Sequence, residues 1–213
     1  TIERITVLPT ERAVIPEKGL PDISRLSLKP GDPAVASEIQ AADNRLVALL
    51  REAGHPFAEM ARREVVVDYA ACVVRLAFRL NPGPRAAFGV VHVKGVERTR
   101  PDVVLKEIPW SAGALYDPAS LTEFQTRLYR TDLFSVVSVK AGENLDKDGK
   151  VPVTVTVVER KHRTISLGLQ YYTDDGPGAL ASWEDRNRRG LGHRIGVNLK
   201  LSERLMGLDG SYR

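Results

Sequence analysis

The sequence has only one cysteine, Cys72, among its 213 residues, so no disulfide can form within the chain. Cys72 opens a strand-like run, Cys72–Leu80, and a free cysteine in such a run usually serves as a small core residue. No stretch approaches the roughly 20 consecutive apolar residues that a membrane-spanning helix needs. The charge excess is also small, because 31 Lys and Arg against 27 Asp and Glu leave a formal net charge of +4 without a long basic block. We therefore expect Cys72 to be buried and no nucleic-acid partner.

Motifs of catalytic and metal sites are missing as well. No Gly-x-Ser-x-Gly elbow or P-loop is present. Asp146 and Asp148 lack the Gly and distal Glu spacing of a calcium loop. The histidines lie in unrelated contexts without the spacing of a zinc site: His55, His92, His162 and His193. We expect no enzymatic activity, no cofactor and no metal.

The sequence does contain a compact unit between Phe88 and Glu159. Phe88–Lys94 alternates like a strand, and a short helix to Ile108 follows, with Thr99 as its expected cap. Asp117 and Pro118 open a second helix. Its apolar residues fall on one face: Leu121, Phe124 and Leu128. Two valine-rich strands complete the order strand, helix, helix, strand, strand: Phe134–Val139 and Val151–Val158.

Residues 1 to about 84 repeat this order at a spacing of roughly 80 residues. Thr1–Leu8 is the expected first strand, and Asp32 caps a long helix with Pro33 in its first turn. That helix has an apolar stripe at helical spacing: Val35, Ile39, Ala42, Leu46, Leu49, Leu50 and Ala53. Two strands follow: Phe57–Val67 and Cys72–Leu80. The residues Asn81-Pro82-Gly83-Pro84 then form a short, stiff joint.

The pattern changes after Glu159, where no helical period returns. Alternating apolar residues indicate a strand over Thr164–Thr173 and another over Leu191–Ser202, with a weaker candidate at Leu180–Asn187. On the two clear strands the apolar side chains share one face: Ile165, Leu167, Leu169, Tyr171, Ile195, Val197, Leu199 and Leu201. Strands of about ten residues, apolar on one face and polar or glycine on the other, are typical of a transmembrane β-barrel.

Several motifs resemble the POTRA domains and first barrel strands of outer-membrane assembly factors of the BamA and TamA superfamily. These motifs are Val93-Lys94-Gly95, Tyr116-Asp117-Pro118, Asp132-Leu133-Phe134, the closing Val-Thr-Val-Val-Glu-Arg, and Trp183-Glu184-x-Arg186-Asn187-x-x-Gly190-x-Gly192. Lys29-Pro30-Gly31-Asp32-Pro33 and Gly54-His55-Pro56-Phe57 resemble the TamA branch more closely. The resemblance implies an α+β fold with three parts: one POTRA domain at residues 1–84, a barrel-proximal POTRA domain at 85–160, and the opening strands of a truncated barrel at 161–213.

The resemblance also implies a function in the assembly or translocation of client β-barrel or autotransporter proteins at the outer membrane of a Gram-negative bacterium. The POTRA domains would lie in the periplasm, with outer-membrane lipid and a TamB-like inner-membrane protein as partners. An exposed strand edge can bind an extended client by backbone pairing. The implied client-binding edge consists of Leu133, Phe134, Ser135, Val136, Val137 and Val139. Thr164–Thr173 would form the barrel seam through Ile165, Leu167, Leu169 and Tyr171, and lipid would contact Ile195, Val197, Leu199 and Leu201.

Two other functions fit the same elements. A two-partner-secretion transporter has the same modules but exports one dedicated client. A soluble periplasmic scaffold would contain three α+β units without membrane contact. Residues 164–213 supply too few strands to close a barrel, so we expect copies to associate through Thr164–Thr173 or Leu191–Ser202.

Overall fold

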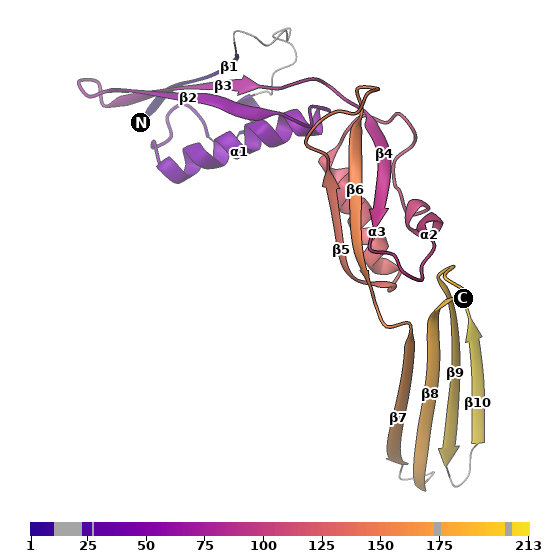
Figure 1. Cartoon of the computed structure of the whole chain (residues 1–213). Coiled ribbons are helices and arrows are strands. Elements are labelled where there is room, and N and C mark those ends of the chain that lie inside the picture. The colour runs from indigo at the N-terminus through magenta and orange to yellow at the C-terminus, as the bar shows by residue number, and fades with distance from the viewer. Residues whose placement is uncertain (11–22, 27, 173–175, 203–205) are drawn as a thin grey trace. The chain divides into compact units, whose positions relative to one another are not determined.

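The computed structural model describes residues 1–10, 23–26, 28–172, 176–202 and 206–213. The described strands form three sheets with the orders β1-β3-β2, β4-β6-β5 and β10-β9-β8-β7, which follow one another along the chain (Figure 1). The chain divides into two compact units. Unit 1 comprises Thr1–Val90, Trp110–Ser120 and Ala141–Val153, and unit 2 comprises Val91–Pro109, Leu121–Lys140 and Thr154–Arg213.

The first sheet of unit 1 has β3 at its centre. Strand β3 (Val73–Asn81) pairs in parallel with β1 (Ile2–Pro9) and antiparallel with β2 (Glu59–Asp68). The 3-10 helix η2 (Ile23–Arg25) and helix α1 (Ala36–Glu52) complete this part. Its core combines apolar residues of α1 and the strands: Ile2, Ile5, Ile39, Ala42, Leu46, Leu50, Leu76, Phe78 and Leu80. The predicted stripe of the long helix is confirmed at its buried positions.

Helix α1 begins later than the sequence predicted. Asp32 does not cap it, because its carboxylate accepts a hydrogen bond from the backbone N–H of Lys29 at 2.8 Å and closes a turn instead. The N-cap residue is Val35, which provides no side-chain hydrogen bond and is 41% exposed. The predicted Asp32 cap was therefore wrong, and Val35, the first residue of the predicted apolar stripe, precedes the helix.

Cys72 is exposed, so the prediction of a core cysteine was also wrong. It lies in the turn between β2 and β3 and has a φ of 53°, a left-handed conformation that places it outside the strand. Tyr69 in the same turn is 87% exposed, so this turn lies at the surface. The thiol is therefore available to solvent.

The second repeat has the predicted order of elements. Strand β4 (Phe88–Lys94) precedes the short helix α2 (Pro101–Leu105), and helix α3 (Pro118–Arg130) precedes β5 (Phe134–Ala141) and β6 (Val151–Glu159). Strand β6 is central, and its alternating valines are almost fully buried: Val151, Val153, Val155 and Val157. The carboxylate of Asp117 accepts a hydrogen bond from the backbone N–H of Ala119 at 3.0 Å, which confirms it as the cap of α3.

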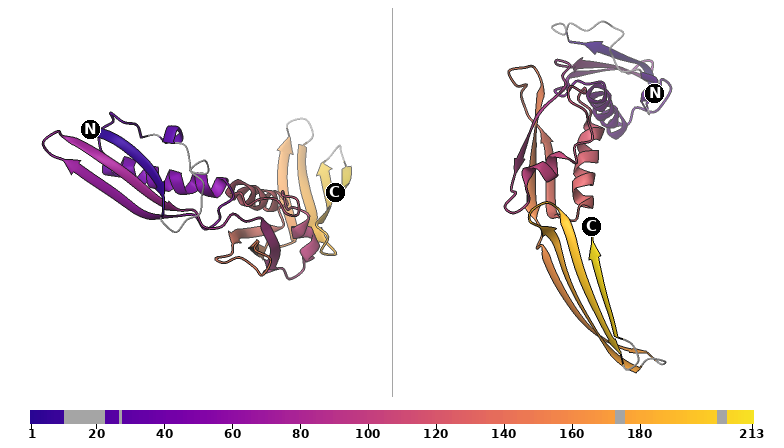
Figure 2. Two further views of the ribbon diagram at one scale, coloured as in Figure 1. Left: turned by 90° about the horizontal axis from the view of Figure 1, so that it is seen from above. Right: turned by 90° about the vertical axis from the view of Figure 1, so that its right-hand side faces the viewer.

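Unit 2 ends in a four-stranded antiparallel sheet. It consists of β7 (Arg163–Tyr172), β8 (Gly176–Arg188), β9 (His193–Ser202) and β10 (Met206–Tyr212), each paired with the next (Figure 2). The weak strand candidate is confirmed as β8, whereas Thr173 of the predicted seam lies outside the described residues. Both sides of β9 are paired, so the expected contact between copies through Leu191–Ser202 has no free edge there.

Candidate functional site

The sheet β7–β10 has one apolar face that solvent reaches. Ile165 pairs with Trp183, Leu167 with Ala181 and Leu169 with Ala179; on β9, Val197, Leu199 and Leu201 pair with these β8 residues. Because residues paired across antiparallel strands share a face, the seam and lipid-facing residues that the sequence singled out lie on one surface. The side chains on the two edge strands are the most exposed: Ile165 72%, Leu167 81%, Leu169 93% and Tyr171 76% on β7, and Met206 79% and Leu208 71% on β10. Their contact with lipid remains a prediction.

The opposite face of this sheet is mostly polar, with Leu180 as an apolar residue between Gly168 and Lys200. It carries Thr164, Ser166 and Gln170 on β7, paired with Glu184, Ser182 and Gly178 on β8. Strand β9 adds Arg194, Asn198 and Lys200. This separation of apolar and polar side chains matches a barrel wall between lipid and a polar interior.

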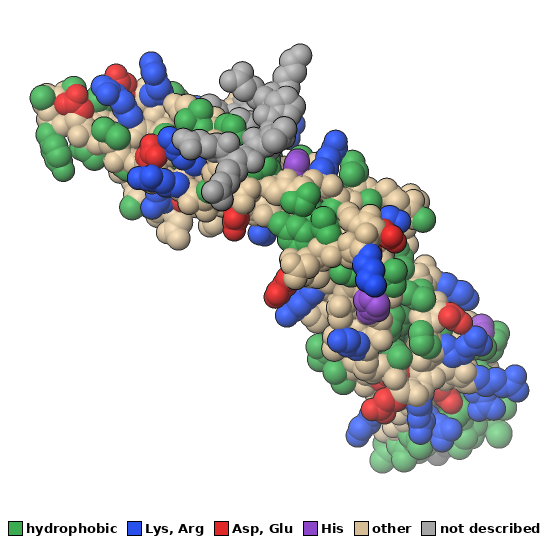
Figure 3. Space-filling model, turned by 45° about the horizontal axis from the view of Figure 1, so that its top comes forward, with side chains coloured by type: hydrophobic (Ala, Val, Ile, Leu, Met, Phe, Trp, Pro, Cys, Tyr) green, Lys and Arg blue, Asp and Glu red, His purple; other side chains and the backbone are tan. Residues whose placement is uncertain are grey.

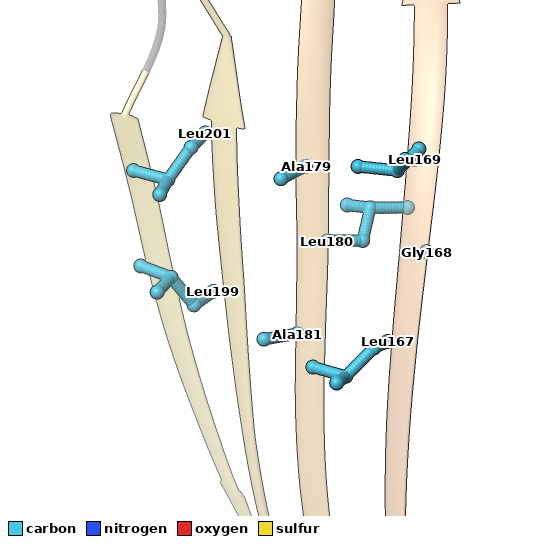
Figure 4. Close-up of a pocket in the computed structure, with 8 residues that line it drawn as sticks. All are labelled: Leu167, Gly168, Leu169, Ala179, Leu180, Ala181, Leu199 and Leu201. Atoms are coloured by element: carbon cyan, nitrogen blue, oxygen red, sulfur yellow. The ribbon is translucent and has the colours of Figure 1, made fainter.

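Small residues make a shallow hollow in the apolar face. Its volume is about 350 Å³, and Ala179 and Ala181 of β8 lie between larger residues of β7 and β9 (Figure 4). The residues that line it are Leu167, Gly168, Leu169, Ala179, Leu180, Ala181, Leu199 and Leu201. None of the residues that line the hollow is charged, so it favours an apolar group such as an acyl chain over a charged one.

A series of buried polar residues joins α2, α3, β5 and β6 of unit 2, here called the POTRA-like elements, to the sheet β7–β10. The carboxylate of Glu159, at the end of β6, accepts hydrogen bonds from the backbone N–H groups of Glu97, Arg98 and Thr99 at 2.7 to 3.2 Å. The side chain of Asn187 on β8 donates to the Thr99 hydroxyl at 2.9 Å. Thr99 and Asn187 are 3% and 7% exposed. Thr99 was predicted as a helix cap, but Arg100 is the N-cap of α2, and Thr99 connects two parts of unit 2 instead.

The Glu159 carboxylate is held in its charged form. Burial alone would raise its pKa, but hydrogen bonds from the Thr99 backbone and hydroxyl and from the backbone of Glu97 and Arg98 lower the pKa to about 2. Successive backbone N–H groups form a concave anion site, and here a side chain of the same protein fills it. His162 lies 3.0 Å from the same carboxylate through its Nε2 atom. The contact between the end of β6 and residues 97–99 is therefore built around one fixed negative charge.

A second charged cluster links the turn after α3 to β8 and β9. Asp132, in a left-handed conformation with a φ of 61°, lies 2.7 Å from Arg160, 3.1 Å from Arg194 and 3.3 Å from Arg186. Glu184 contacts Arg186 and Arg194 at 3.1 and 3.2 Å. Such a network orients planar guanidinium groups more firmly than isolated ion pairs do.

The turn between β8 and β9 docks on the segment before α2. The backbone N–H of Arg100 donates to the carbonyl of Gly190 at 3.0 Å, and that of Gly192 donates to the side chain of Asn187 at 2.9 Å. A Cβ atom on Gly190 would lie 2.2 Å from the carbonyl oxygen of Arg98, so only glycine permits this approach. These contacts give a physical reason for the spacing of Glu184, Arg186, Asn187, Gly190 and Gly192, which sequence resemblance alone had singled out.

Strand β5 is an edge strand, but its middle is occupied. The OH of Tyr129 accepts a hydrogen bond from the N–H of Val137 at 3.2 Å, and Gln125 donates to the Val137 carbonyl at 2.9 Å. The backbone groups of Ser135 and Val139 point the same way as those of Val137, because this direction alternates along a strand. A client strand could therefore pair fully with β5 only by displacing two side chains of α3.

The predicted edge residues have different surroundings. Leu133, Phe134 and Val137 are buried, whereas Val136 is 51% exposed and Ser135 is exposed. The sequence did not indicate that Gln125 and Tyr129 contact β5, although their spacing of four residues places them on one side of α3 beside Phe124 and Leu128. Nothing in the sequence indicated that this side meets a strand edge.

Within the described ranges, no group of three or more His, Cys, Asp or Glu side chains could hold a metal ion. No helix in this part of the chain is long and apolar enough to cross a membrane.

A family model described as POTRA, surface antigen variable number repeat, matches residues 86–160. The chain is 23% identical over 178 residues to the outer membrane protein assembly factor BamA of Neisseria meningitidis, and 25% identical over 199 residues to BamA of Neorickettsia risticii. These alignments cover 84% and 88% of this chain but only 22% and 26% of those proteins.

The fold is similar to a crystal structure of BamA from Haemophilus ducreyi that lacks POTRA domains 1–3. The TM-score is 0.81 at 18% sequence identity, over 99% of this chain and 39% of that chain. The predicted α+β fold, with POTRA domains followed by barrel strands, is confirmed. The expected outer-membrane localisation, with the POTRA domains in the periplasm, agrees with these relatives. Residues 86–160 thus match the POTRA family, and the chain is similar in sequence to BamA-type outer membrane protein assembly factors.

Proposed function

We propose that the chain is the POTRA region and barrel start of an outer-membrane factor that assembles or translocates client β-barrel or autotransporter proteins. The observation that carries the proposal is the exposed apolar face of β7–β10, joined to the POTRA-like elements by the Glu159 and Asp132 clusters. A soluble scaffold would leave this face in water, which soluble proteins avoid for large apolar patches. In the outer membrane, the apolar face of β7–β10 would contact lipid instead of water.

Clients bind at β5 by strand addition in this proposal. An edge strand accepts an extended chain through backbone hydrogen bonds and makes few demands on its sequence, which suits a factor with many clients. Gln125 and Tyr129 keep the centre of the edge closed until a client replaces their hydrogen bonds with Val137. The strand β7 is the seam, because it is the edge of the four-stranded sheet β7–β10 and follows the POTRA-like elements in the chain.

Within the superfamily we assign the chain to the TamA branch, with a TamB-like inner-membrane protein as its partner. This finer assignment rests on Lys29-Pro30-Gly31-Asp32-Pro33 and on Gly54-His55-Pro56-Phe57. Co-purification with a TamB-like protein from the source membrane tests it separately from client binding.

Cysteine crosslinking tests the client edge. A peptide with the sequence of residues 164–172 and one added cysteine serves as a model client strand, and Cys72→Ser removes the exposed native thiol. Val136→Cys places a thiol on β5 and Val90→Cys a matched thiol on β4, since the native side chains are 51% and 61% exposed. Both strands are edges of the same sheet, so exposure and geometry are comparable.

We expect the peptide to crosslink to Val136→Cys several times more efficiently than to Val90→Cys. Excess peptide without cysteine should compete for this reaction. Equal yields at both positions would mean that β5 is not the client edge.

A further inference from the structure

A basic hollow lies where β7 begins and β8 ends. Its volume is about 430 Å³, and unit 2 forms it from the joint after β6, the segment before α2 and the β8–β9 turn. Four arginines contribute to its lining together with few other groups: Arg98, Arg163, Arg188, Arg189, His162, Asp185, Asn187 and Gly190. The hollow is distinct from the Asp132 cluster, which uses other arginines.

The positive charge of this hollow exceeds the negative charge beside it, because four arginines stand against two carboxylates: Asp185 in the lining and Glu159, which lies 3.0 Å from His162. Asp185 is 5% exposed, accepts a hydrogen bond from the backbone of Asn187 and lies 3.7 Å from Arg163. Among the described residues, no carboxylate forms an ion pair with Arg98, Arg188 or Arg189. Guanidinium groups stay charged and match the oxygens of a phosphate in a bidentate manner. The hollow therefore favours a phosphate-like anion.

The hollow continues into the apolar face of the sheet. Arg163 pairs with Asp185, and the next pair on the same face is Ile165 with Trp183. From Arg163 to Leu169 the strand rises about 20 Å at roughly 3.3 Å per residue, and at the tilt of about 40° of a barrel strand this spans about 15 Å, one leaflet of a hydrocarbon core about 30 Å thick. Lys and Arg side chains gather beside the hydrophobic side chains of this end of unit 2 (Figure 3). The surface thus presents an anion site at the base of an acyl-sized apolar surface.

We propose that this hollow binds the phosphate of a glycerophospholipid headgroup, while the acyl chains of the same lipid lie along the apolar face of β7 and β8. The inference rests on the proposed membrane-facing role of the sheet and adds a defined headgroup site to it. A free phosphate would contact only the arginines and leave the adjoining face uncovered, so it should bind more weakly than a lipid that contacts both. A phospholipid satisfies both surfaces, and basic pockets beside membrane segments bind such headgroups.

Fluorescence of Trp183 reports this binding, because Trp183 lies on the apolar face next to the hollow. The chain has two tryptophans, so Trp110→Phe in the full chain leaves Trp183 as the only one. Dihexanoylphosphatidylglycerol below its micelle concentration is the probe. Inorganic phosphate and dihexanoylglycerol are the comparison ligands, one with the anion alone and one with the same acyl chains alone.

We expect the phosphatidylglycerol to shift the Trp183 emission to shorter wavelength with saturation. Arg188→Gln combined with Arg189→Gln should require roughly thirtyfold more lipid, since each arginine near a lipid phosphate contributes about fivefold. Arg4→Gln combined with Arg62→Gln removes the same charge from unit 1 and should leave the titration unchanged. Inorganic phosphate at the same concentrations should neither produce the shift nor displace the lipid.

Three results would overturn the headgroup site: an unchanged titration of the Arg188 and Arg189 variant, an equal loss in the Arg4 and Arg62 variant, or displacement by inorganic phosphate. If both lipids shift Trp183 equally, the sheet binds lipid but the hollow does not select the headgroup. If neither lipid shifts Trp183 in the parent chain, the proposed membrane-facing role fails together with the site.

Discussion

Strands β6 and β7 follow one another in the chain and alternate with the same period, yet their apolar side chains have opposite surroundings. Val151, Val153 and Val155 on β6 are 0% exposed, whereas Leu167 and Leu169 on β7 are 81% and 93% exposed. Helix α3 lies against the sheet of β6, and no described helix lies against the sheet of β7 (Figure 1). Periodicity therefore sets which residues share a face, and a second layer of structure decides whether that face meets protein or another solvent.

The two strands also differ in residue type. The buried face of β6 is made only of valine, which packs well in a protein core at fixed rotamers. The exposed face of β7 contains Ile165, two leucines and Tyr171, while its other face contains serine, glycine and glutamine. Larger apolar residues without a covering layer are suited to lipid, in agreement with the proposed function.

An acidic residue on each face should give the largest contrast between these strands. Val155→Asp places an unpaired charge in the core and should lower the free energy of unfolding by at least about 4 kcal/mol. Leu167→Asp should change it by less than about 0.5 kcal/mol in water, because position 167 is exposed. Chemical denaturation followed by circular dichroism measures both. Comparable losses would mean that the β7 face is covered in solution.

Acid should weaken the hydrogen bonds between the Glu159 carboxylate, at the end of β6, and the backbone of residues 97–99. The folded-state pKa of Glu159 is about 2, below the ordinary glutamate pKa of 4.5, so its contribution is complete above pH 4.5 and disappears as the pH falls toward 2. A shift of this size corresponds to about 3 kcal/mol. Hydrogen exchange of the backbone amides of residues 97–99 should accelerate over this range relative to unfolded peptides. Glu159→Gln should remove this pH dependence, and its persistence would assign the effect to other groups.

Removing the charge of Asp132 should loosen the sheet without unfolding the POTRA-like elements. Asp132→Asn tolerates the same left-handed backbone but leaves Arg160, Arg186 and Arg194 without their shared carboxylate. We expect a loss of about 2 kcal/mol in the protection of β8 amides from hydrogen exchange. Asp102→Asn is the matched control, since Asp102 pairs only with the exposed Arg100. Equal effects of the two substitutions would deny the cluster a role in the joint.

Opening the edge of β5 should have the smallest effect on stability and a visible one on client binding. Tyr129→Phe removes the acceptor for the N–H of Val137 and should cost about 1 kcal/mol. The same change should raise the crosslinking of the β7 peptide to Val136→Cys by a few-fold, because one bond no longer has to be displaced. Unchanged crosslinking would show that Tyr129 does not control this edge.

The sequence predicted most of the strands and helices, and the predictions that were wrong have physical causes. The alternation of Val151–Val158 and Thr164–Thr173 was visible because strand side chains repeat every two residues. The prediction that Thr99 and Asp32 cap helices was wrong. A capping residue is predicted from its neighbours in sequence, whereas the partners of these two residues are Asn187 on β8 and the backbone of Lys29. The closure of β5 by Gln125 and Tyr129 depends on the placement of a helix beside an edge, which local patterns do not encode.

In the proposed function, one face of β7 meets lipid and the other meets a polar interior. Single cysteines at residues 164–170 in the Cys72→Ser chain, each carrying a spin label, can be compared for collision with oxygen, which enters lipid, and with a water-soluble nickel complex. In phosphatidylglycerol vesicles we predict that labels at positions 165, 167 and 169 collide more with oxygen and that labels at 164, 166, 168 and 170 collide more with nickel. Equal collision rates along the strand, or the reverse alternation, would contradict the account.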